Sequence, residues 1–193
     1  MAPNKPNVRV LVLPVLVMFL GVCSMFLLGC RRDTFSYSNA VIDRKLIPVL
    51  EADTVTTLVS DSGVIQYRVT AAQWQVFDKA EPAYWEFPSG LYLEKFDESL
   101  AVKLFIRSDY AHYDCDNEVW LLRGNVHSLN IEGEEFFTPE LYWEQKTGKV
   151  HSDSSIKIVQ KNVILQGVGF ESNQSLTQYV ILNTTGVFPI EEN

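Results

Sequence analysis

The chain has 193 residues and carries 16 lysine and arginine side chains against 24 aspartate and glutamate side chains, a formal net charge of -8. Nucleic-acid binding depends on lysine and arginine at the phosphates, so this acidic balance argues against a nucleic-acid partner. Of the three cysteines, Cys23 and Cys30 lie within or directly after an apolar amino-terminal run, which leaves Cys115 without a partner for a disulfide framework. The fold must therefore rest on a hydrophobic core.

The amino-terminal run, residues 10–29, contains no charged side chain and is long enough to cross a bilayer as one helix. The same run also has the features of a secretion signal. Its end, Leu27-Leu28-Gly29 before Cys30, resembles a bacterial lipobox, in which Cys30 would carry the lipid, although a small residue is usual at the position of Leu28. Residues 1–30 are therefore predicted to be either a lipoprotein signal or an uncleaved transmembrane anchor. In both cases we expect the rest of the chain outside the cytoplasm.

A tether and a single domain are predicted after the anchor. Residues 31–52 mix charged and apolar side chains without a sustained period, as is typical of a tether. The domain is predicted at residues 53–190. It opens with a strand-favouring run at residues 54–59, and Asp61-Ser62-Gly63 then indicates a turn.

The rest of the domain reads as short strands separated by turn residues. The next strand alternates, with Ile65, Tyr67, Val69 and Ala71 on one face. Further strands are predicted at residues 90–96, 101–113, 118–122, 125–131, 136–143, 149–152, 155–160, 163–171 and 178–182. No stretch after residue 31 predicts a helix. This pattern predicts an all-β fold, an antiparallel sandwich or jelly roll.

An internal repeat supports the all-β prediction. Three segments carry apolar residues in which the first two positions are two apart and the last two are six apart. The sets are Ala72, Trp74, Trp85 and Leu91; Ala111, Tyr113, Trp120 and Val126; and Leu141, Trp143, Val150 and Ile156. Because a step of two residues is typical of strands, each set predicts one hairpin, recurring every 30 to 40 residues.

Motifs for catalysis, metal binding and cofactors are missing from the sequence. The histidines His112, His127 and His151 have no cysteine or carboxylate at zinc-site spacing. The sequence contains no nucleophile elbow, no P-loop and no glycine-rich dinucleotide turn. We therefore expect neither an enzyme nor a cofactor or metal site.

The ordered series of motifs resembles the LptC family, the periplasmic component of the lipopolysaccharide export machine. The first half of the resemblance lies in Asp61-Ser62-Gly63 with Tyr67 and Ala71, in Phe87-Pro88-Ser89-Gly90, and in the unit from Asp109 to Val126. The second half runs from Thr138-Pro139-Glu140-Leu141 to Gly167-Val168-Gly169-Phe170. The resemblance covers about residues 40 to 188, and its unit is also similar to that of LptA and the amino-terminal domain of LptD.

The resemblance implies a twisted antiparallel β-jellyroll of the OstA, LptA and LptC type, anchored on the periplasmic side of the inner membrane. It implies docking on LptF and LptG, which work with the ATPase LptB, and transfer of lipopolysaccharide to LptA. Lipid A acyl chains would lie in the interior of the jellyroll. Family members usually carry a transmembrane helix, so a lipobox would be a departure.

A lipid carrier is also physically reasonable for such a chain. Each methylene costs about 0.8 kcal/mol in water, so an acyl chain of about a dozen carbons would cost roughly 10 kcal/mol to cross water unprotected. A carrier needs an apolar lining and a way to pass its cargo on. An edge strand supplies the second, because its unpaired N–H and C=O groups can accept a strand from a neighbouring protein.

These considerations give candidate residues for three surfaces. The predicted lipid groove comprises Ile65, Tyr67, Val69, Ile106, Trp120, Leu122, Trp143, Ile156 and Leu165. The predicted edge toward the transporter comprises Val55, Leu58 and Gly63, and the predicted edge toward LptA comprises Leu165, Phe170, Tyr179 and Ile181. A packed interior would use the same apolar residues. The alternative is therefore a surface or periplasmic β-sandwich lipoprotein with a structural or protein-binding role.

Overall fold

The computed structural model describes residues 43–189. The apolar run at residues 10–29, the candidate lipid-attachment residue Cys30 and residues 31–42 of the predicted tether lie outside the described residues. A short 3₁₀ turn, η1 (Arg44–Leu46), precedes the sheet, and the Asp43 carboxylate accepts a hydrogen bond from the Lys45 amide at its start. No helix in residues 43–189 has the length and apolar character needed to span a membrane.

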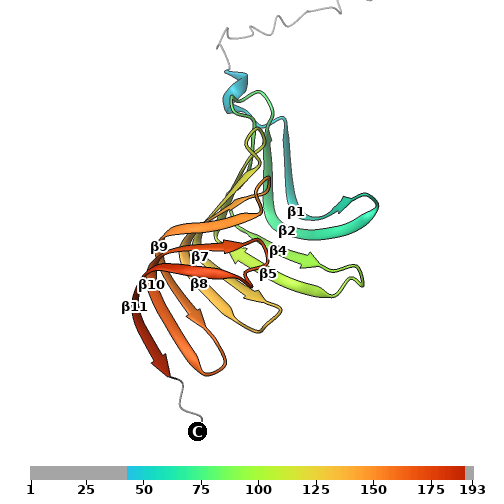
Figure 1. Ribbon diagram of the computed structural model, residues 1–193. Helices are drawn as coiled ribbons and strands as arrows, with labels where there is room; N and C mark the ends of the chain where they lie inside the picture. The colour runs from blue at the N-terminus through green and yellow to red at the C-terminus, as the bar shows by residue number, and fades with distance from the viewer. Residues whose placement is uncertain (1–42, 190–193) are drawn as a thin grey trace, which may run out of the picture. The chain divides into compact units, whose positions relative to one another are not determined.

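The described residues form one antiparallel sheet (Figure 1). The all-β prediction is confirmed. The first strand begins at Leu50, three residues before the predicted start of the domain at residue 53. The strands are β1 (Leu50–Asp61), β2 (Val64–Phe77), β3 (Tyr84–Phe87), β4 (Leu91–Phe96), β5 (Val102–Ser108), β6 (Tyr110–Asp114), β7 (Val119–Asn130), β8 (Glu135–Glu144), β9 (Lys149–Val159), β10 (Val163–Asn173) and β11 (Tyr179–Pro189).

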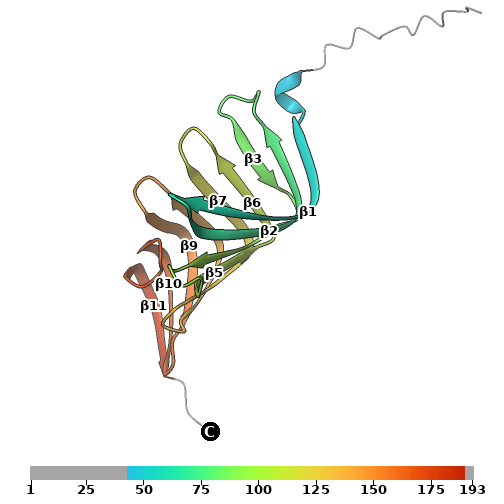
Figure 2. The same cartoon turned by 90° about the vertical axis from the view of Figure 1, so that its right-hand side faces the viewer.

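The long strands bend at mid-length, and this bend divides the sheet into two layers (Figure 2). Residues 67–71 of β2 pair with β4, whereas residues 75–77 of the same strand pair with β3. Likewise, the first part of β7 pairs with β6 and its last part with β5. One half of each long strand thus belongs to the layer that contains β3 and β6, and the other half to the layer that contains β4 and β5. We call these the β3–β6 layer and the β4–β5 layer.

The two layers separate where the chain passes from β3 to β4 and from β5 to β6. Gly90 makes the first passage with a φ of +78°, a backbone conformation that favours glycine. A Cβ atom at Gly90 would also collide with the Ser108 carbonyl oxygen. Asp109 makes the second passage, and its amide donates to the Gly124 carbonyl on β7 at 2.9 Å. We call the place where the two layers separate the fork of the sheet. The motif residues around Gly90 and Asp109 fix the backbone at this fork.

Bulges at the bends correct several of the predicted strand limits. The predicted turn at residues 123–125 is a bulge inside the single strand β7, with Gly124 and Asn125 at φ values of +72° and +46°. Similarly, the predicted break between residues 152 and 155 lies within β9. Conversely, the single strand predicted at residues 101–113 is divided into two strands, β5 and β6, because the chain passes from one layer to the other at Asp109. Turn-forming residues produce a bulge rather than a turn wherever the strand continues into the second layer.

The predicted hairpins of the three repeats are present. Tyr113 on β6 pairs with Trp120 on β7, and Trp143 on β8 pairs with Val150 on β9. In the first repeat, the Trp74 and Trp85 rings lie 5.2 Å apart across the β2–β3 hairpin.

The prediction of Ala72 as the first inward apolar position of the first repeat is wrong. Ala72 is exposed, whereas the neighbouring Ala71 is buried at 5% exposure. Ala72 lies at the bend of β2, between the segment that pairs with β4 and the segment that pairs with β3. The regular alternation of inward and outward side chains is interrupted there, which explains the shift by one residue.

Candidate functional site

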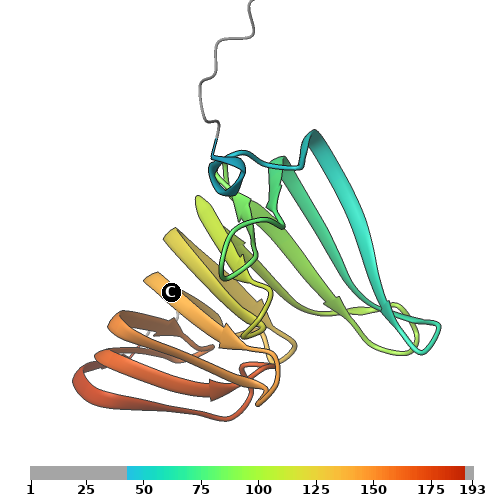
Figure 3. The ribbon, with the colours of Figure 1, turned by 90° about the horizontal axis from the view of Figure 1, so that it is seen from above.

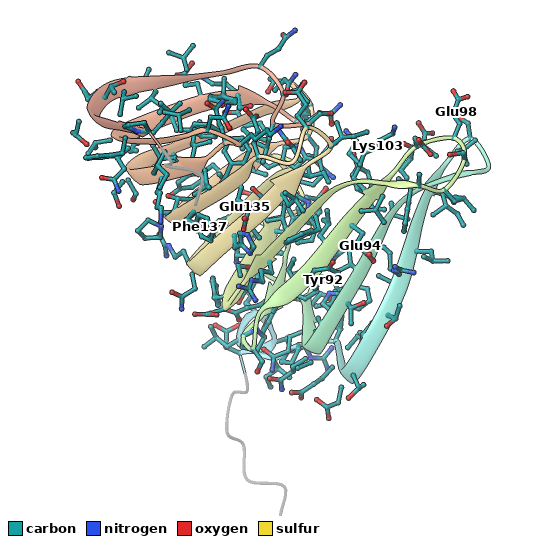
Figure 4. The ribbon with its side chains drawn as sticks, turned by 90° about the horizontal axis from the view of Figure 1, so that it is seen from below. Tyr92, Glu94, Glu98, Lys103, Glu135 and Phe137 are labelled. Atoms are coloured by element: carbon teal, nitrogen blue, oxygen red, sulfur yellow. The ribbon has the colours of Figure 1, made fainter. Side chains whose placement is uncertain are left out.

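The space between the two layers is lined by the inward side chains of every long strand. On β4, for example, Leu91, Leu93 and Lys95 alternate with Tyr92 and Glu94 on the other face, where Glu94 is 8% exposed and pairs with Arg68. Figure 4 shows Tyr92 and Glu94 on β4 together with Phe137 on β8, viewed from below. Apart from Lys95 and a few hydroxyl and amide groups, the inward residues are apolar. The chemistry of this interior is therefore that of a hydrophobic binding space or of a packed core.

Most of the predicted groove residues belong to the packed centre of the interior. The six in this centre expose between 2% and 6% of their surface, and they are Val69, Ile106, Trp120, Leu122, Trp143 and Ile156. The other three, Ile65, Tyr67 and Leu165, are half-buried. Tyr67 and Leu165 pack against the centre without being covered by it.

Half-buried residues form a rim at both ends of the packed centre. On the side of β2, β3 and β6, the rim consists of Tyr67, Trp74, Trp85 and Tyr113. On the side of β10 and β11, it consists of Leu165, Tyr179 and Ile181. These side chains are the part of the apolar interior that a ligand could contact without displacing the packed centre. Sequence reasoning missed Trp74, Trp85 and Tyr113 as rim residues, although the repeat had singled them out.

Three tryptophan side chains leave a hydrogen-bonding group unused. The indole N–H groups of Trp74, Trp120 and Trp143 are buried, and none has an acceptor among residues 43–189. A buried donor without a partner costs roughly 1–3 kcal/mol. A ligand that brought carbonyl or hydroxyl oxygens into the interior would remove this cost.

Aromatic contacts join the two layers across the interior. Tyr67, in the β4–β5 layer, has its ring centroid 5.5 Å from that of Trp143, in the β3–β6 layer. Near the β10–β11 turn, the ring centroid of Phe136, in the β4–β5 layer, lies 5.3 Å from that of Tyr179, in the β3–β6 layer. Such pairs contribute about 0.5–1.5 kcal/mol beyond the burial of their area, so each is a weak link between the layers.

The turn between β10 and β11 closes the interior at its carboxyl-terminal end. Leu176, in this turn, exposes 1% of its surface and belongs to the packed centre. The Asn130 side-chain amide, at the end of β7, donates to the Leu176 carbonyl oxygen at 2.7 Å. We call residues 173–178 the clasp, because they belong to the tip of one layer and bind the tip of the other.

A polar network supports the clasp. The Tyr179 hydroxyl donates to the Glu134 carboxylate at 3.1 Å, and Gln160 donates to both of these side chains. Burial, followed by the nearby Glu134 carboxylate, raises the pKa of Tyr179 to about 12. Tyr179 therefore remains a neutral hydrogen-bond donor at physiological pH.

Among residues 43–189, β1 and β11 are the two strands that pair with a single neighbour (Figure 3). β1 contains no lysine, arginine or proline, although it carries the acids Glu51, Asp53 and Asp61, and β11 contains no charged residue and a proline only at its last position. Proteins usually protect an edge strand with such residues. Both edges also expose large apolar side chains: Leu50, Leu58 and Val59 on β1, and Val180, Leu182, Val187 and Phe188 on β11.

Only some of the residues predicted for the two edges lie on an edge strand or in its turn. Val55 and Leu58 lie on β1, and Gly63 lies in the β1–β2 turn with a φ of +84°. Tyr179 and Ile181 lie on β11. Leu165 and Phe170 instead lie on β10, which is paired on both sides, and Phe170 is 1% exposed. Leu165 and Phe170 are therefore one strand inside the edge.

The histidines and other polar groups do not form a metal site in the described part of the chain. Within residues 43–189, no three His, Cys, Asp or Glu side chains are grouped so that they could hold a metal ion. His127 and His151 each lie beside one carboxylate, with Nε2 2.8 Å from Glu135 and 3.3 Å from Glu144. The His127 ring also stacks on Phe137 on the outer face, with 4.5 Å between the ring centroids.

Comparison with known protein families gives one match. The family described as "Lipopolysaccharide-assembly, LptC-related" matches residues 15–187, most of the chain. Comparison with curated proteins gives no match.

Proposed function

Because the chain belongs to the LptC family and thus to a lipopolysaccharide transport system, we propose that it is the membrane-anchored periplasmic component of the lipopolysaccharide export transporter. It accepts lipopolysaccharide from the inner-membrane complex of LptB, LptF and LptG and passes it to LptA. The amino-terminal segment, as a lipid anchor at Cys30 or as a single-pass helix, holds the domain at the inner membrane. The domain itself is a carrier and performs no catalysis.

The observation that carries this proposal is a continuous apolar interior between two layers, with half-buried aromatic residues packed against its buried centre. Separation of the layers would expose the packed centre, at roughly 25 cal/mol for each Å² of apolar surface. Acyl chains that entered the gap would cover the same surface and would lose their own contact with water. Exposure of the packed centre costs free energy, and its coverage by acyl chains recovers free energy. The net cost of loading is therefore smaller than the cost of separating the layers alone. The unpartnered indole N–H groups would gain acceptors from the ester and hydroxyl oxygens of the lipid.

The two edge strands support the proposed direction of transfer. β1 is the first strand after the proposed anchor and tether, so its free edge is the one nearest in sequence to the membrane and the transporter. β11 ends the sheet on the other side, and its uncharged, apolar edge suits the addition of a strand from LptA. In this arrangement, the interiors of neighbouring proteins would form a continuous apolar path for the acyl chains.

The packed centre also agrees with the alternative, a β-sandwich lipoprotein with a structural or protein-binding role. The two functions differ in what the interior contacts. In the carrier, lipid reaches inward side chains during export. In the structural protein, the interior excludes lipid under all conditions.

Site-specific photocrosslinking in cells tests the proposed function. A photoreactive residue at Val55 should capture LptF or LptG, one at Tyr179 should capture LptA, and one at Leu165 should capture lipopolysaccharide. The matched control is a photoreactive residue at Tyr92, which lies on the outer face and is 38% exposed. It should capture none of these. Capture of the same protein from Val55 and Tyr179 would refute the polarity, and absence of lipid at Leu165 would refute the carrier.

A further inference from the structure

One inward side chain of the interior is a cation. Lys95 follows Leu91 and Leu93 on the inner side of β4, near the tip of the β4–β5 layer. Its Nζ lies 5.9 Å from the centroid of the Tyr67 ring, which in turn contacts Trp143 across the interior. Its Nζ also lies 3.4 Å from the Ser175 hydroxyl of the clasp. Lys95 therefore lies where the rim, the packed centre and the clasp meet.

Lys95 has no carboxylate partner. Among residues 43–189, no carboxylate oxygen lies within ion-pair distance of its Nζ, although the chain is acidic. The neighbouring acid Glu94 faces outward and pairs with Arg68. Asp97, in the following turn, pairs with the Lys103 ammonium at 3.0 Å. The acids nearest in sequence thus neutralise other cations.

The environment of Lys95 does not favour its charge. Partial burial lowers the pKa of the Lys95 ammonium, since a cation loses hydration in apolar surroundings. The Ser175 hydroxyl is a neutral partner at the long end of hydrogen-bond distance. A charged acceptor at this point would form a shorter and stronger hydrogen bond than the serine does.

We propose that Lys95 binds a phosphate group on the sugar head of the lipid whose acyl chains enter the interior. This inference rests on the proposed function and specifies the head-group contact of the same site. Lipid A combines acyl chains with a phosphorylated sugar head. With its chains between the layers, its head lies at the layer tips, where Lys95 is. The phosphate replaces Ser175 as the partner of the ammonium, and the clasp loses one of its contacts to the β4–β5 layer.

The test uses the full-length chain in detergent, with a photoreactive residue at Leu165 that reports bound lipid. The two probes are lipid A with its phosphates and lipid A from which the phosphates have been removed. Lys95→Met removes the charge at similar length and should weaken binding of the phosphorylated probe about tenfold, as expected for one charge-assisted hydrogen bond. It should leave binding of the dephosphorylated probe unchanged, which also shows that the variant is folded. Lys95→Arg, which keeps the charge, should bind both probes as the unsubstituted chain does.

The matched control is Lys157→Met. Lys157 is exposed on the outer face of β9, with its Nζ 5.7 Å from the Phe137 ring centroid, and its loss should change neither affinity. Equal affinities of Lys95→Met and the unsubstituted chain for phosphorylated lipid A would overturn the assignment of Lys95 and leave the carrier intact. Competition by inorganic phosphate in large molar excess would assign the site to free phosphate instead and overturn the head-group contact. Failure of the unsubstituted chain to bind either probe would overturn the carrier itself.

Discussion

The Tyr67 ring on β2 lies 5.5 Å from the Trp143 ring on β8, with an angle of 56° between their planes. β2 and β8 are not neighbours in the sheet, and the two residues belong to different layers. This contact therefore spans the interior. If acyl chains occupy the interior, Tyr67 and Trp143 must move apart, which makes the pair a direct indicator of loading.

A double-mutant cycle of Tyr67→Leu and Trp143→Leu should give a coupling energy of about 0.5–1.5 kcal/mol in the free energy of unfolding without lipid. With saturating lipopolysaccharide, the coupling should fall toward zero, because the rings no longer touch. The measurement is urea unfolding of the four proteins. The control is the Tyr142 and His151 pair, which stacks at 5.1 Å between neighbouring strands of one layer. Loss of coupling in both pairs, or in neither, would contradict the separation of the layers.

The fork of the sheet should be the position that is least tolerant of a side chain. Gly90→Ala adds a methyl group against the rigid Ser108 carbonyl at a positive φ, so we expect a loss of about 3 kcal/mol or more in unfolding free energy. Gly133→Ala is the matched control, since Gly133 has a φ of +81° but no atom within 4 Å of the place that a Cβ would occupy. It should cost only about 1 kcal/mol. Equal losses in both variants would show that steric closeness at the fork is unimportant.

The class of fold and most of its hairpins followed from local patterns in the sequence. Alternation identified the inward face of β2 at Tyr67 and Val69, and the spacing of Trp120 and Trp143 identified two hairpins. The bends did not follow from these patterns. Gly124 and Asn125 have the composition of a turn, and only the pairing of β7 with two different strands shows that the chain continues as one bulged strand.

The sequence identified which side chains face inward, but it could not distinguish a groove from a core. An apolar residue such as Ile156 is expected in a groove and in a core alike. The alternation of the sequence shows which face of the strand it lies on, but not whether protein or ligand covers that face. The clasp was missed for a related reason. Leu176 is a single apolar residue in a polar turn, and the Asn130 amide that binds its carbonyl oxygen is 46 residues away in the sequence.

The β11 edge should lose its partner when it acquires a charge. Val180→Lys places an ammonium on this strand at a position that is 60% exposed, so the unfolding free energy should change by less than about 0.5 kcal/mol. Pull-down of LptA should nevertheless fall strongly, because a lysine on an edge opposes strand addition. The control Val168→Lys lies on β10, one strand inside the edge, at 43% exposure. Equal recovery of LptA with both variants would count against the edge as the docking site.

The turn before β2 should matter for the transporter more than for lipid. Ser62 and Gly63 both have positive φ values, +49° and +84°, as the tight two-residue hairpin turn requires. Gly63→Val should therefore strain the turn by about 2 kcal/mol and reduce co-purification with LptF and LptG, while lipid crosslinking at Leu165 persists. Gly133→Val, in the β7–β8 turn, carries the same kind of strain and should co-purify normally. Normal co-purification of Gly63→Val would remove this turn from the docking surface.

The most direct measurement of the central claim is a lipid-crosslinking scan of β2, with a photoreactive residue placed in turn at six successive positions, residues 64–69. We predict labelling by lipopolysaccharide at the inward positions Ile65, Tyr67 and Val69 and little at the outward positions Val64, Gln66 and Arg68. Such a period of two can arise only if the lipid lies against the inner face of the strand. Labelling that is uniform along the six positions, or confined to the outward ones, would contradict a carrier that holds acyl chains between its layers.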